Sequence, residues 1–270
     1  MRKQTGLTRV DAVVILACIA LVLAQAAVLN AGGRERSKKE VCLANLRTLT
    51  AAWKMYADDN AGKIVNGGQP WSGTGSLHPT EPYWCTPLPP LDATDEVGTF
   101  STTRFDWDPT LPYAERVSLL KRGALYGYVQ NPDIYRCPEA DKTAHRSYVM
   151  PTSMNAAWTF DPTCFPSVKV AKSTGQIVKP NERIVFMEEK PISPDAFMFP
   201  ALTTCMLLDI LSVTHGNGTN FAFADGHAEY HRWECQSTII WALSQNQPSP
   251  SDTCFKTKDR AWVQNAIWGE

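Results

Sequence analysis

The residues best suited to chemistry lie in the stretch HGNGTNFAFADGHAEYH, from His215 to His231. His227, Glu229 and His231 alternate, so on a strand they project from one face with neighbours roughly 6.5–7 Å apart. Two imidazoles and a carboxylate are suitable ligands for Zn²⁺ or Cu²⁺. They need further ligands from elsewhere, however, and a solvent-facing polar strand explains the same pattern. We therefore predict neither a metal ion nor a cofactor.

His215 is separated by nine residues from Asp225-Gly226. An extended strand of nine residues spans about 30 Å. His215 therefore contacts Asp225 only if the chain folds back, and otherwise it serves its own loop. Asp225-Gly226 predicts a hairpin with a two-residue type I′ turn, in which Gly226 supplies positive φ and Asp225 binds turn amides. Phe221 and Phe223 then share one strand face. We predict a structural role for His215, Asp225 and Gly226.

The chain has eight cysteines, of which Cys18 lies in an apolar run and is most simply a small hydrophobic residue. In an oxidising compartment the other seven can form disulfides, and an odd number leaves at least one outside a pair. No CxxC occurs, which disfavours a zinc knuckle or a thioredoxin-like motif. Their pairing is left open by the sequence. The seven cysteines are Cys42, Cys85, Cys137, Cys164, Cys205, Cys235 and Cys254.

Motifs for hydrolysis or phosphate binding are missing from the sequence. It contains no GxSxG, no HExxH and no GxxxxGK[ST]. A cysteine–histidine nucleophile is left open, but disulfides explain the cysteines more economically. We predict that the chain is not an enzyme. A net charge of −1 and a pI near 6.5 give no reason to expect a nucleic-acid partner.

The elements that position these residues begin with an apolar run, Ala12 to Leu29, which contains no charged residue. As a helix these residues cover roughly 27 Å, close to the thickness of a bilayer's hydrocarbon core. Arg2, Lys3 and Arg9 place the N-terminus in the cytoplasm by the positive-inside rule. A cleaved secretory signal is an alternative, since small residues follow the run. Against it, the run exceeds the usual apolar region of roughly 7–15 residues.

A second helical pattern extends from Ser37 to Asp58, beyond a weak point or kink at Gly32-Gly33, and ends at Asn60 and Gly62. Its basic residues from Lys38 to Lys54 largely face away from its apolar side. Residues 64–110 are rich in Gly, Pro and aromatic residues without periodicity. We expect its aromatic residues Trp71, Tyr83, Trp84 and Trp107 to anchor this insertion to the core, with stacking on sugars or on a neighbouring subunit as the alternative.

The remaining chain alternates short helices and strands. We predict a short helix followed by a turn over 117–128, a strand within 147–158, a buried strand over 184–187, and a helix or strand over 238–243. Glu188-Glu189 at the end of the buried strand has the appearance of a ligand or helix cap, but we expect an exposed strand end. The fold class is therefore α+β: a long N-terminal helix packed on a mostly antiparallel sheet, with long irregular insertions.

Several motifs resemble a known family. Gly6 followed by Leu7 and Thr8, with Asp11 at the edge of the apolar run, resembles the signal of type IV pilin-like proteins. The H-X9-DG motif at His215 resembles a pilin-like family of planctomycete-type bacteria. Further matches are CLANLRTLTAAWKMYADDNAGK, GALYGYVQNPDIYRCPEAD and KPNERIVFMEE, in the family's order over nearly the whole chain.

The resemblance implies cleavage by a prepilin peptidase between Gly6 and Leu7, methylation of Leu7, and a pairing of Asp11 with a freed N-terminal amine in a filament. Two residues depart from the pattern, because Asp11 replaces the usual Glu and Arg9 occupies an apolar position. Arg9 can pair with Asp11 or reach the headgroups. The implied divisions are a leader (1–6), a transmembrane assembly helix (7–30), its soluble half (31–62) and a head domain (63–270).

We therefore expect a pilin-like or type II secretion pseudopilin-like subunit in the bacterial inner membrane, single-pass, with an extracytoplasmic head. Its partners would be the prepilin peptidase, other pilin-like subunits and the lipid bilayer. The alternative is a solitary anchored envelope module that binds glycans through the aromatic insertion. Polymerisation distinguishes the two: the pilin-like subunit polymerises, with or without the Asp11 charge pair, and the solitary module does not.

Overall fold

The computed structural model describes residues 9–68, 81–85, 112–141, 143–156, 162–166, 169–189, 196–249 and 251–269; of residues 9–32 it describes the backbone alone. Helices are combined with a four-stranded antiparallel sheet. The predicted α+β class is therefore confirmed.

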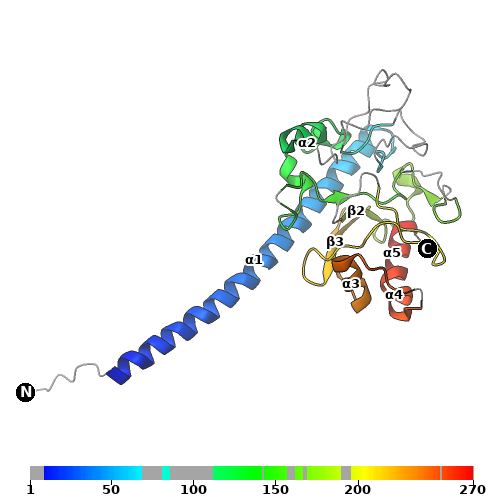
Figure 1. Cartoon of the computed structure of the whole chain (residues 1–270). Coiled ribbons are helices and arrows are strands. Elements are labelled where there is room, and N and C mark those ends of the chain that lie inside the picture. Colours follow the sequence, from blue (N-terminus) through cyan, green and yellow to red (C-terminus); the bar gives the residue numbers. More distant parts are fainter. Residues whose placement is uncertain are drawn as a thin grey trace, which may run out of the picture.

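Helix α1 (Arg9–Asp59) is a single α-helix of 51 residues. It continues through Gly32 and Gly33 without a break, so the weak point predicted there does not interrupt it. It ends as predicted, because Ala61 and Gly62 have φ of 55° and 81° and cannot continue a right-handed helix. In Figure 1 the C-terminal part of α1 lies against the head, and the remainder extends away from it.

The sheet contains β1 (Tyr148–Val149), β2 (Ile184–Glu188), β3 (Gly218–Phe223) and β4 (Ala228–Arg232) in chain order, each antiparallel to the next. The predicted buried strand is confirmed in β2, whose five residues are all buried. Strand β1 has only two residues, so most of the strand predicted there is irregular. An irregularity of register between Ile184 and Phe186 interrupts the simple alternation of β2.

The β3–β4 hairpin is confirmed, but its predicted two-residue type I′ turn is wrong. Phe223 and His227 close a three-residue loop, in which the N–H of Phe223 donates to the His227 carbonyl (2.9 Å). Only Gly226 has positive φ (109°), whereas a type I′ turn needs it at both central residues. The glycine thus serves as the left-handed residue of a longer loop.

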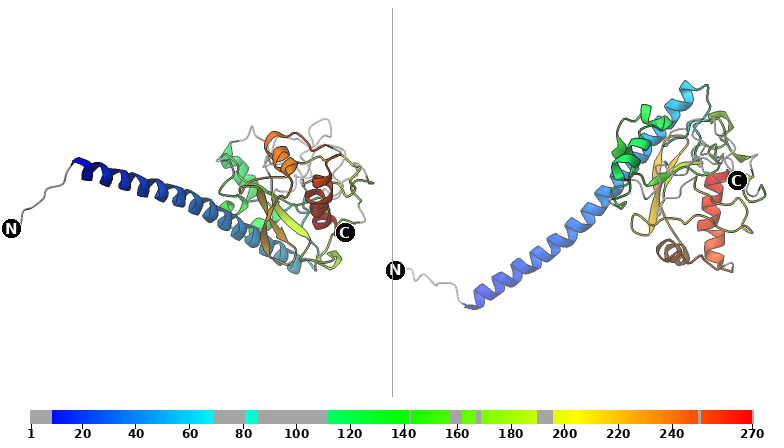
Figure 2. Two further views of the ribbon diagram at one scale, coloured as in Figure 1. Left: turned by 90° about the horizontal axis from the view of Figure 1, so that it is seen from below. Right: turned by 45° about the horizontal axis from the view of Figure 1, so that its top comes forward.

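Each face of the sheet carries its own hydrophobic core, which gives three layers (Figure 2). The helix-side core lies between α1 and the sheet, where Leu46 and Trp53 pack with Phe186 and Ala222. The far-side core holds Phe221 and Phe223 of β3 with residues of the C-terminal helices. The predicted alternation along β3 is confirmed. The C-terminal helices are α3 (Gln236–Ser244), α4 (Thr253–Thr257) and α5 (Asp259–Trp268).

The other helical segments differ in part from the sequence pattern. Helix α2 (Tyr113–Leu120) begins four residues before the predicted short helix, and the turn predicted after that helix contains the 3₁₀-helix η2 (Ala124–Gly127). Two further 3₁₀-helices are η3 (Pro132–Tyr135) and η5 (Thr174–Gln176). Helix α3 settles the choice at 238–243 in favour of a helix, while α4 and α5 were not predicted.

Basic residues of α1 hold the helix on the β3–β4 hairpin, although the sequence pattern placed them largely away from the packed face. Arg47 donates to the carbonyl of Ala228 (3.1 Å), and Lys54 donates to that of Asp225 (2.9 Å). Lys39 lies 4.5 Å above the ring of Tyr230. Their long stems let charged heads reach the sheet from the flank of the helix.

The insertion is described at its two ends. Ile64 and Val65 are buried, and Asn66 bridges to Tyr83. Tyr83 and Trp84 are each 1% exposed, so these two aromatics anchor the insertion as expected. Trp71 and Trp107 lie outside the described residues.

Of the seven cysteines outside the apolar run, four form two disulfides, Cys164–Cys205 and Cys235–Cys254. Cys42, Cys85 and Cys137 remain buried thiols. Gly6 and Leu7 lie outside the described residues, as does the side chain of Asp11. Within the part of the chain whose side chains are described, no helix has the length and apolarity needed to cross a membrane; the predicted span at 7–30 lies outside that part.

Candidate functional site

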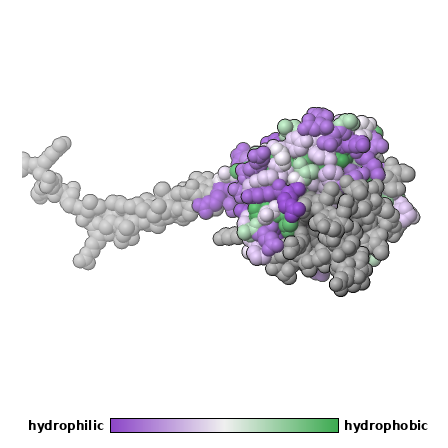
Figure 3. Space-filling view, turned by 90° about the horizontal axis from the view of Figure 1, so that it is seen from above, coloured by the Kyte–Doolittle hydropathy of each residue, from purple (hydrophilic) through white to green (hydrophobic). Residues whose placement is uncertain are grey.

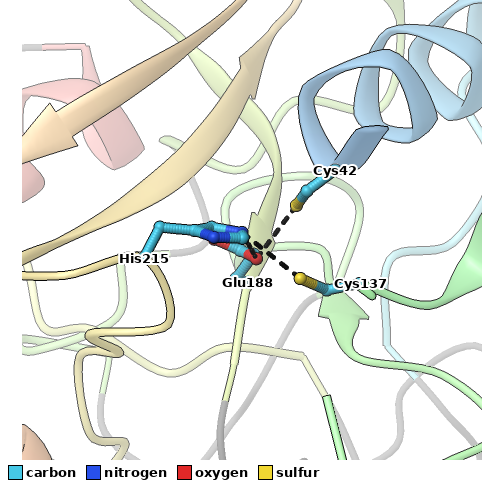
Figure 4. A group of neighbouring side chains, drawn as sticks. All are labelled: Cys42, Cys137, Glu188 and His215. Atoms are coloured by element: carbon cyan, nitrogen blue, oxygen red, sulfur yellow. Dashed lines mark hydrogen bonds and ion pairs between the residues drawn. The ribbon is translucent and has the colours of Figure 1, made fainter. Parts of the chain in front are cut away.

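Four side chains that bind metals in other proteins meet between α1 and the sheet: Cys42, Cys137, Glu188 and His215 (Figure 4). One ligand atom from each lies within 4.8 Å of the other three. The residues are 0%, 1%, 1% and 3% exposed, respectively. We call this group the Cys–Glu–His cluster.

The two thiols reach the cluster from different elements. Cys42 lies on the buried face of α1, one turn before Leu46. Cys137 follows η3, and its backbone N–H donates to Ser147 Oγ (2.6 Å). The Cys137 sulfur also accepts from the N–H of Glu139 (3.4 Å). These hydrogen bonds therefore fix the position of the Cys137 thiol without the help of a bound ligand.

Glu188 corrects the sequence prediction of an exposed strand end, since it and Glu189 are 1% and 4% exposed. It is the last residue of β2, and its side chain projects toward α1. Glu188 Oε2 accepts from the backbone N–H of Asn220 (2.8 Å). A carboxylate this deeply buried must be satisfied by hydrogen bonds or a cation, because an isolated buried charge is costly.

The sequence left two possibilities for His215: contact with Asp225, or a role within its own loop. The structure shows that His215 does not contact Asp225 and that its role is not confined to its own loop. Its main chain is held in the loop before β3, where its carbonyl accepts from Tyr230 OH (2.8 Å). Its ring reaches Cys137 and Glu188 instead. Asp225 and Gly226 lie at the other end of β3, in the hairpin loop. The two ends of the H-X9-DG motif therefore serve different parts of the fold.

The cluster is connected by short polar contacts. His215 Nε2 lies 3.3 Å from Cys137 Sγ and 3.1 Å from Glu188 Oε1. Cys42 Sγ donates to Glu188 Oε1 (2.9 Å) and accepts from Tyr148 OH (3.2 Å). His215 Nδ1 is buried and has no hydrogen-bond partner among the described residues. Nε2 is thus the ring nitrogen that faces the other three groups.

Burial and mutual contact set the protonation of the cluster. Burial raises the pKa of the Cys42 thiol far above its ordinary value, as do its neighbours Cys137 and Glu188. Hydrogen bonding with Cys42 lowers the pKa of Cys137 against the opposing effect of burial, and His215 lowers it further. Burial alone would lower the pKa of His215, but hydrogen bonds and negative charge from Cys137 and Glu188 raise it to about 10. These contacts therefore favour the imidazolium form of His215.

The alternating His227, Glu229 and His231 are not brought together as ligands. His227 Nδ1 lies 2.7 Å from Asp225 Oδ1. Burial would raise the pKa of Asp225, but hydrogen bonds from His227 outweigh it and lower that pKa. His231 stacks on Trp262 with ring centroids 3.7 Å apart, and burial lowers its pKa. Within the described residues the Cys–Glu–His cluster is the only group with metal-ligand geometry.

Two kinds of chemistry suit the cluster: a cysteine–histidine nucleophile, or the binding of a metal ion. A nucleophile must meet its substrate, and Cys137 is 1% exposed. Two sulfurs, one imidazole nitrogen and one carboxylate oxygen form a complete four-ligand set. No local sequence signal indicates this site, because metal sites are recognised from motifs such as CxxC and these four residues come from four separate segments.

Gly218→Ala is expected to disturb the His215 loop. A Cβ at this position would overlap the carbonyl of His231 and lie 2.6 Å from the Tyr230 ring. Overpacking of this kind costs about 1–3 kcal/mol. Urea unfolding measures the loss, and Gly175→Ala is the control, because a Cβ at Gly175 meets no atom within 4 Å. Equal stability of the two variants would contradict the prediction.

No protein-family model, curated protein or solved structure matches this chain.

Proposed function

We propose that the chain is a membrane-anchored pilin-like subunit. It is cleaved by a prepilin peptidase after Gly6 and assembles with other pilin-like subunits into a type IV filament or a secretion pseudopilus. The observation that carries this proposal is helix α1, a continuous helix of 51 residues. One part of α1 packs on the head, and the rest extends away from it (Figures 1 and 2).

Three further features support the same function. The extended part of α1 carries the uncharged sequence from Ala12 to Leu29, whose length as a helix suits a bilayer. Hydrophilic residues dominate the described atoms of the head face in Figure 3, with small hydrophobic patches between them. The two disulfides suit an oxidising compartment outside the cytoplasm. A single helix would then join a bilayer to an extracytoplasmic head of pilin-like fold.

In such an assembly the apolar helices bundle in the filament core, and the heads form its surface. A carboxylate at the membrane edge is costly unless it is paired. Asp11 would meet the methylated amine of Leu7 on a neighbouring subunit.

Mass spectrometry of the mature N-terminus tests the processing directly. We expect a chain that begins at Leu7 and carries one added methyl group. A chain that retains residues 1–6, or one cut after Ala31 by signal peptidase, would refute the pilin-like processing. Host cells without prepilin peptidase serve as the control and should yield the uncleaved chain.

The alternative, a solitary glycan-binding module, requires aromatic residues that are open to a sugar. Trp84 is 1% exposed and is covered by Tyr135 and Phe186, with ring centroids at 6.0 Å and 5.3 Å. Its ring is therefore used within the core. Trp71 lies outside the described residues. This burial leaves pilin-like assembly as the better-supported function.

A further inference from the structure

We propose that the Cys–Glu–His cluster binds one Zn²⁺ ion, which fastens helix α1 to the sheet of the head. The ligands would be Sγ of Cys42 and Cys137, one carboxylate oxygen of Glu188, and Nε2 of His215. The site does not rest on the pilin-like function, because it lies wholly within the head and the packed part of α1.

The donor set matches the preferences of zinc. Zn²⁺ is bound in tetrahedral sites by thiolate sulfur at about 2.3 Å, imidazole nitrogen at about 2.0 Å and carboxylate oxygen at about 2.0–2.2 Å. These bond lengths separate neighbouring donor atoms by roughly 3.3–3.8 Å. The contacts to Glu188 Oε1 are 2.9 Å from Cys42 and 3.1 Å from His215, and His215 lies 3.3 Å from Cys137. No separation between the four donor atoms exceeds 4.8 Å, so shifts of about an ångström or less would bring them to these values around an ion.

Hydrogen bonds already orient the ligands from outside. Glu188 keeps Oε2 on the N–H of Asn220, which leaves Oε1 directed at the other three groups. Cys42 accepts from Tyr148 OH, and Cys137 accepts from the N–H of Glu139. Outer contacts of this kind fix ligand direction and tune affinity in metal sites. The arrangement thus includes the supporting shell as well as the four ligands.

Other occupants fit less well. Ca²⁺ and Mg²⁺ require six or more oxygen ligands, whereas half of these donors are sulfur. Thiolates and imidazole instead select zinc among the common divalent ions, and four protein ligands leave no open coordination position for catalysis. On binding, the thiols and the His215 imidazolium release their protons to solvent, and no electron is transferred. The ion would be structural, like those that hold small metal-dependent domains together.

A surface pocket offers the ion a route to the cluster. The pocket has a volume of about 500 Å³ and reaches His215 beside Gly216 and Tyr230. Acidic and basic side chains from α1 form its opposite wall, namely Glu35, Arg36, Lys39 and Glu40. Among the four residues of the cluster, His215 is the one that lines this pocket.

The consequence of binding would be a cross-link between four segments that are distant in the chain. Cys42 belongs to α1, Cys137 to the segment after η3, Glu188 to β2 and His215 to the loop before β3. Because an unfolded chain does not hold these ligands together, the binding free energy adds to folding stability. The position of the head on its helix would then depend on the metal.

The test is metal analysis of the full-length chain, purified in detergent from cells grown with added zinc. We expect about one zinc ion per chain, and less than about 0.1 in the Cys137→Ser and His215→Ala variants. Cys85→Ser is the matched control, because Cys85 is also a fully buried thiol but lies outside the cluster. This control should keep about one zinc ion per chain.

Two measurements protect the test against variants that misfold. Glu188→Gln keeps the side-chain volume and an oxygen for Asn220, and should weaken zinc binding at least about tenfold. Co²⁺ added to the metal-free wild-type chain should produce thiolate-to-cobalt charge transfer and tetrahedral visible bands. Each of three results would overturn the proposal. They are a folded wild-type chain without zinc, a cobalt spectrum lacking those bands, and a Cys42–Cys137 disulfide in peptide maps.

Discussion

Removal of the bound zinc is expected to lower the Tm of the full-length chain by about 8–16 °C. A ligand that binds only the folded state at a thousandfold excess over its Kd contributes about 4.1 kcal/mol to the free energy of unfolding. In a domain of this size each kcal/mol shifts Tm by roughly 2–4 °C. Without the ion, Glu188 and His215 remain buried at 1% side-chain exposure each, next to two thiols.

Thermal unfolding followed by circular dichroism, with and without a zinc chelator, measures this shift. The samples must be kept anaerobic without added thiol, because a reductant would also cleave Cys164–Cys205 and Cys235–Cys254. The His215→Ala variant is the control, since its Tm should not respond to the chelator. An equal response in both proteins would show that the chelator acts elsewhere, and an unchanged wild-type Tm would refute a structural ion.

Asp11→Ala is expected to abolish filament assembly: the number of filaments per cell should fall about a hundredfold or more. Removing one partner of a buried charge pair costs about 3–5 kcal/mol, and about 1.4 kcal/mol corresponds to a factor of ten. In the proposed filament, loss of the Asp11 carboxylate would leave the amine of Leu7 unpaired at the membrane edge. Every subunit interface repeats the loss.

Electron microscopy of sheared filaments, with membrane levels of the subunit measured in parallel, checks this result. Asp58→Ala is the control, because Asp58 is an exposed carboxylate on the same helix, beyond the membrane-proximal part. It should assemble like the wild type. Normal filaments from Asp11→Ala would disprove the charge pair, and strictly monomeric wild-type protein would disprove assembly itself.

Sequence patterns determined the parts of this protein that depend on near neighbours in the chain. Strand alternation placed Phe221 and Phe223 on the opposite face of the sheet from Ala222, and the structure divides them between the two cores in that way. Equally local signals predict the end of α1, which stops just before Asn60 and Gly62, and the buried strand β2. Helices α4 and α5 escaped prediction because both are short, and because α5 also buries the polar residues Asp259, Arg260 and Gln264.

Only the tertiary structure decided what the cysteines, Glu188 and His215 do. It pairs four cysteines over separations of 41 and 19 residues, and it places Cys42 and Cys137 beside a carboxylate that local sequence assigned to the surface. The physical reason is that such contacts depend on how distant segments pack together, and at the Cys–Glu–His cluster they depend on how α1 crosses the sheet. That crossing is set by the burial of many apolar side chains together, and no spacing along the chain encodes it.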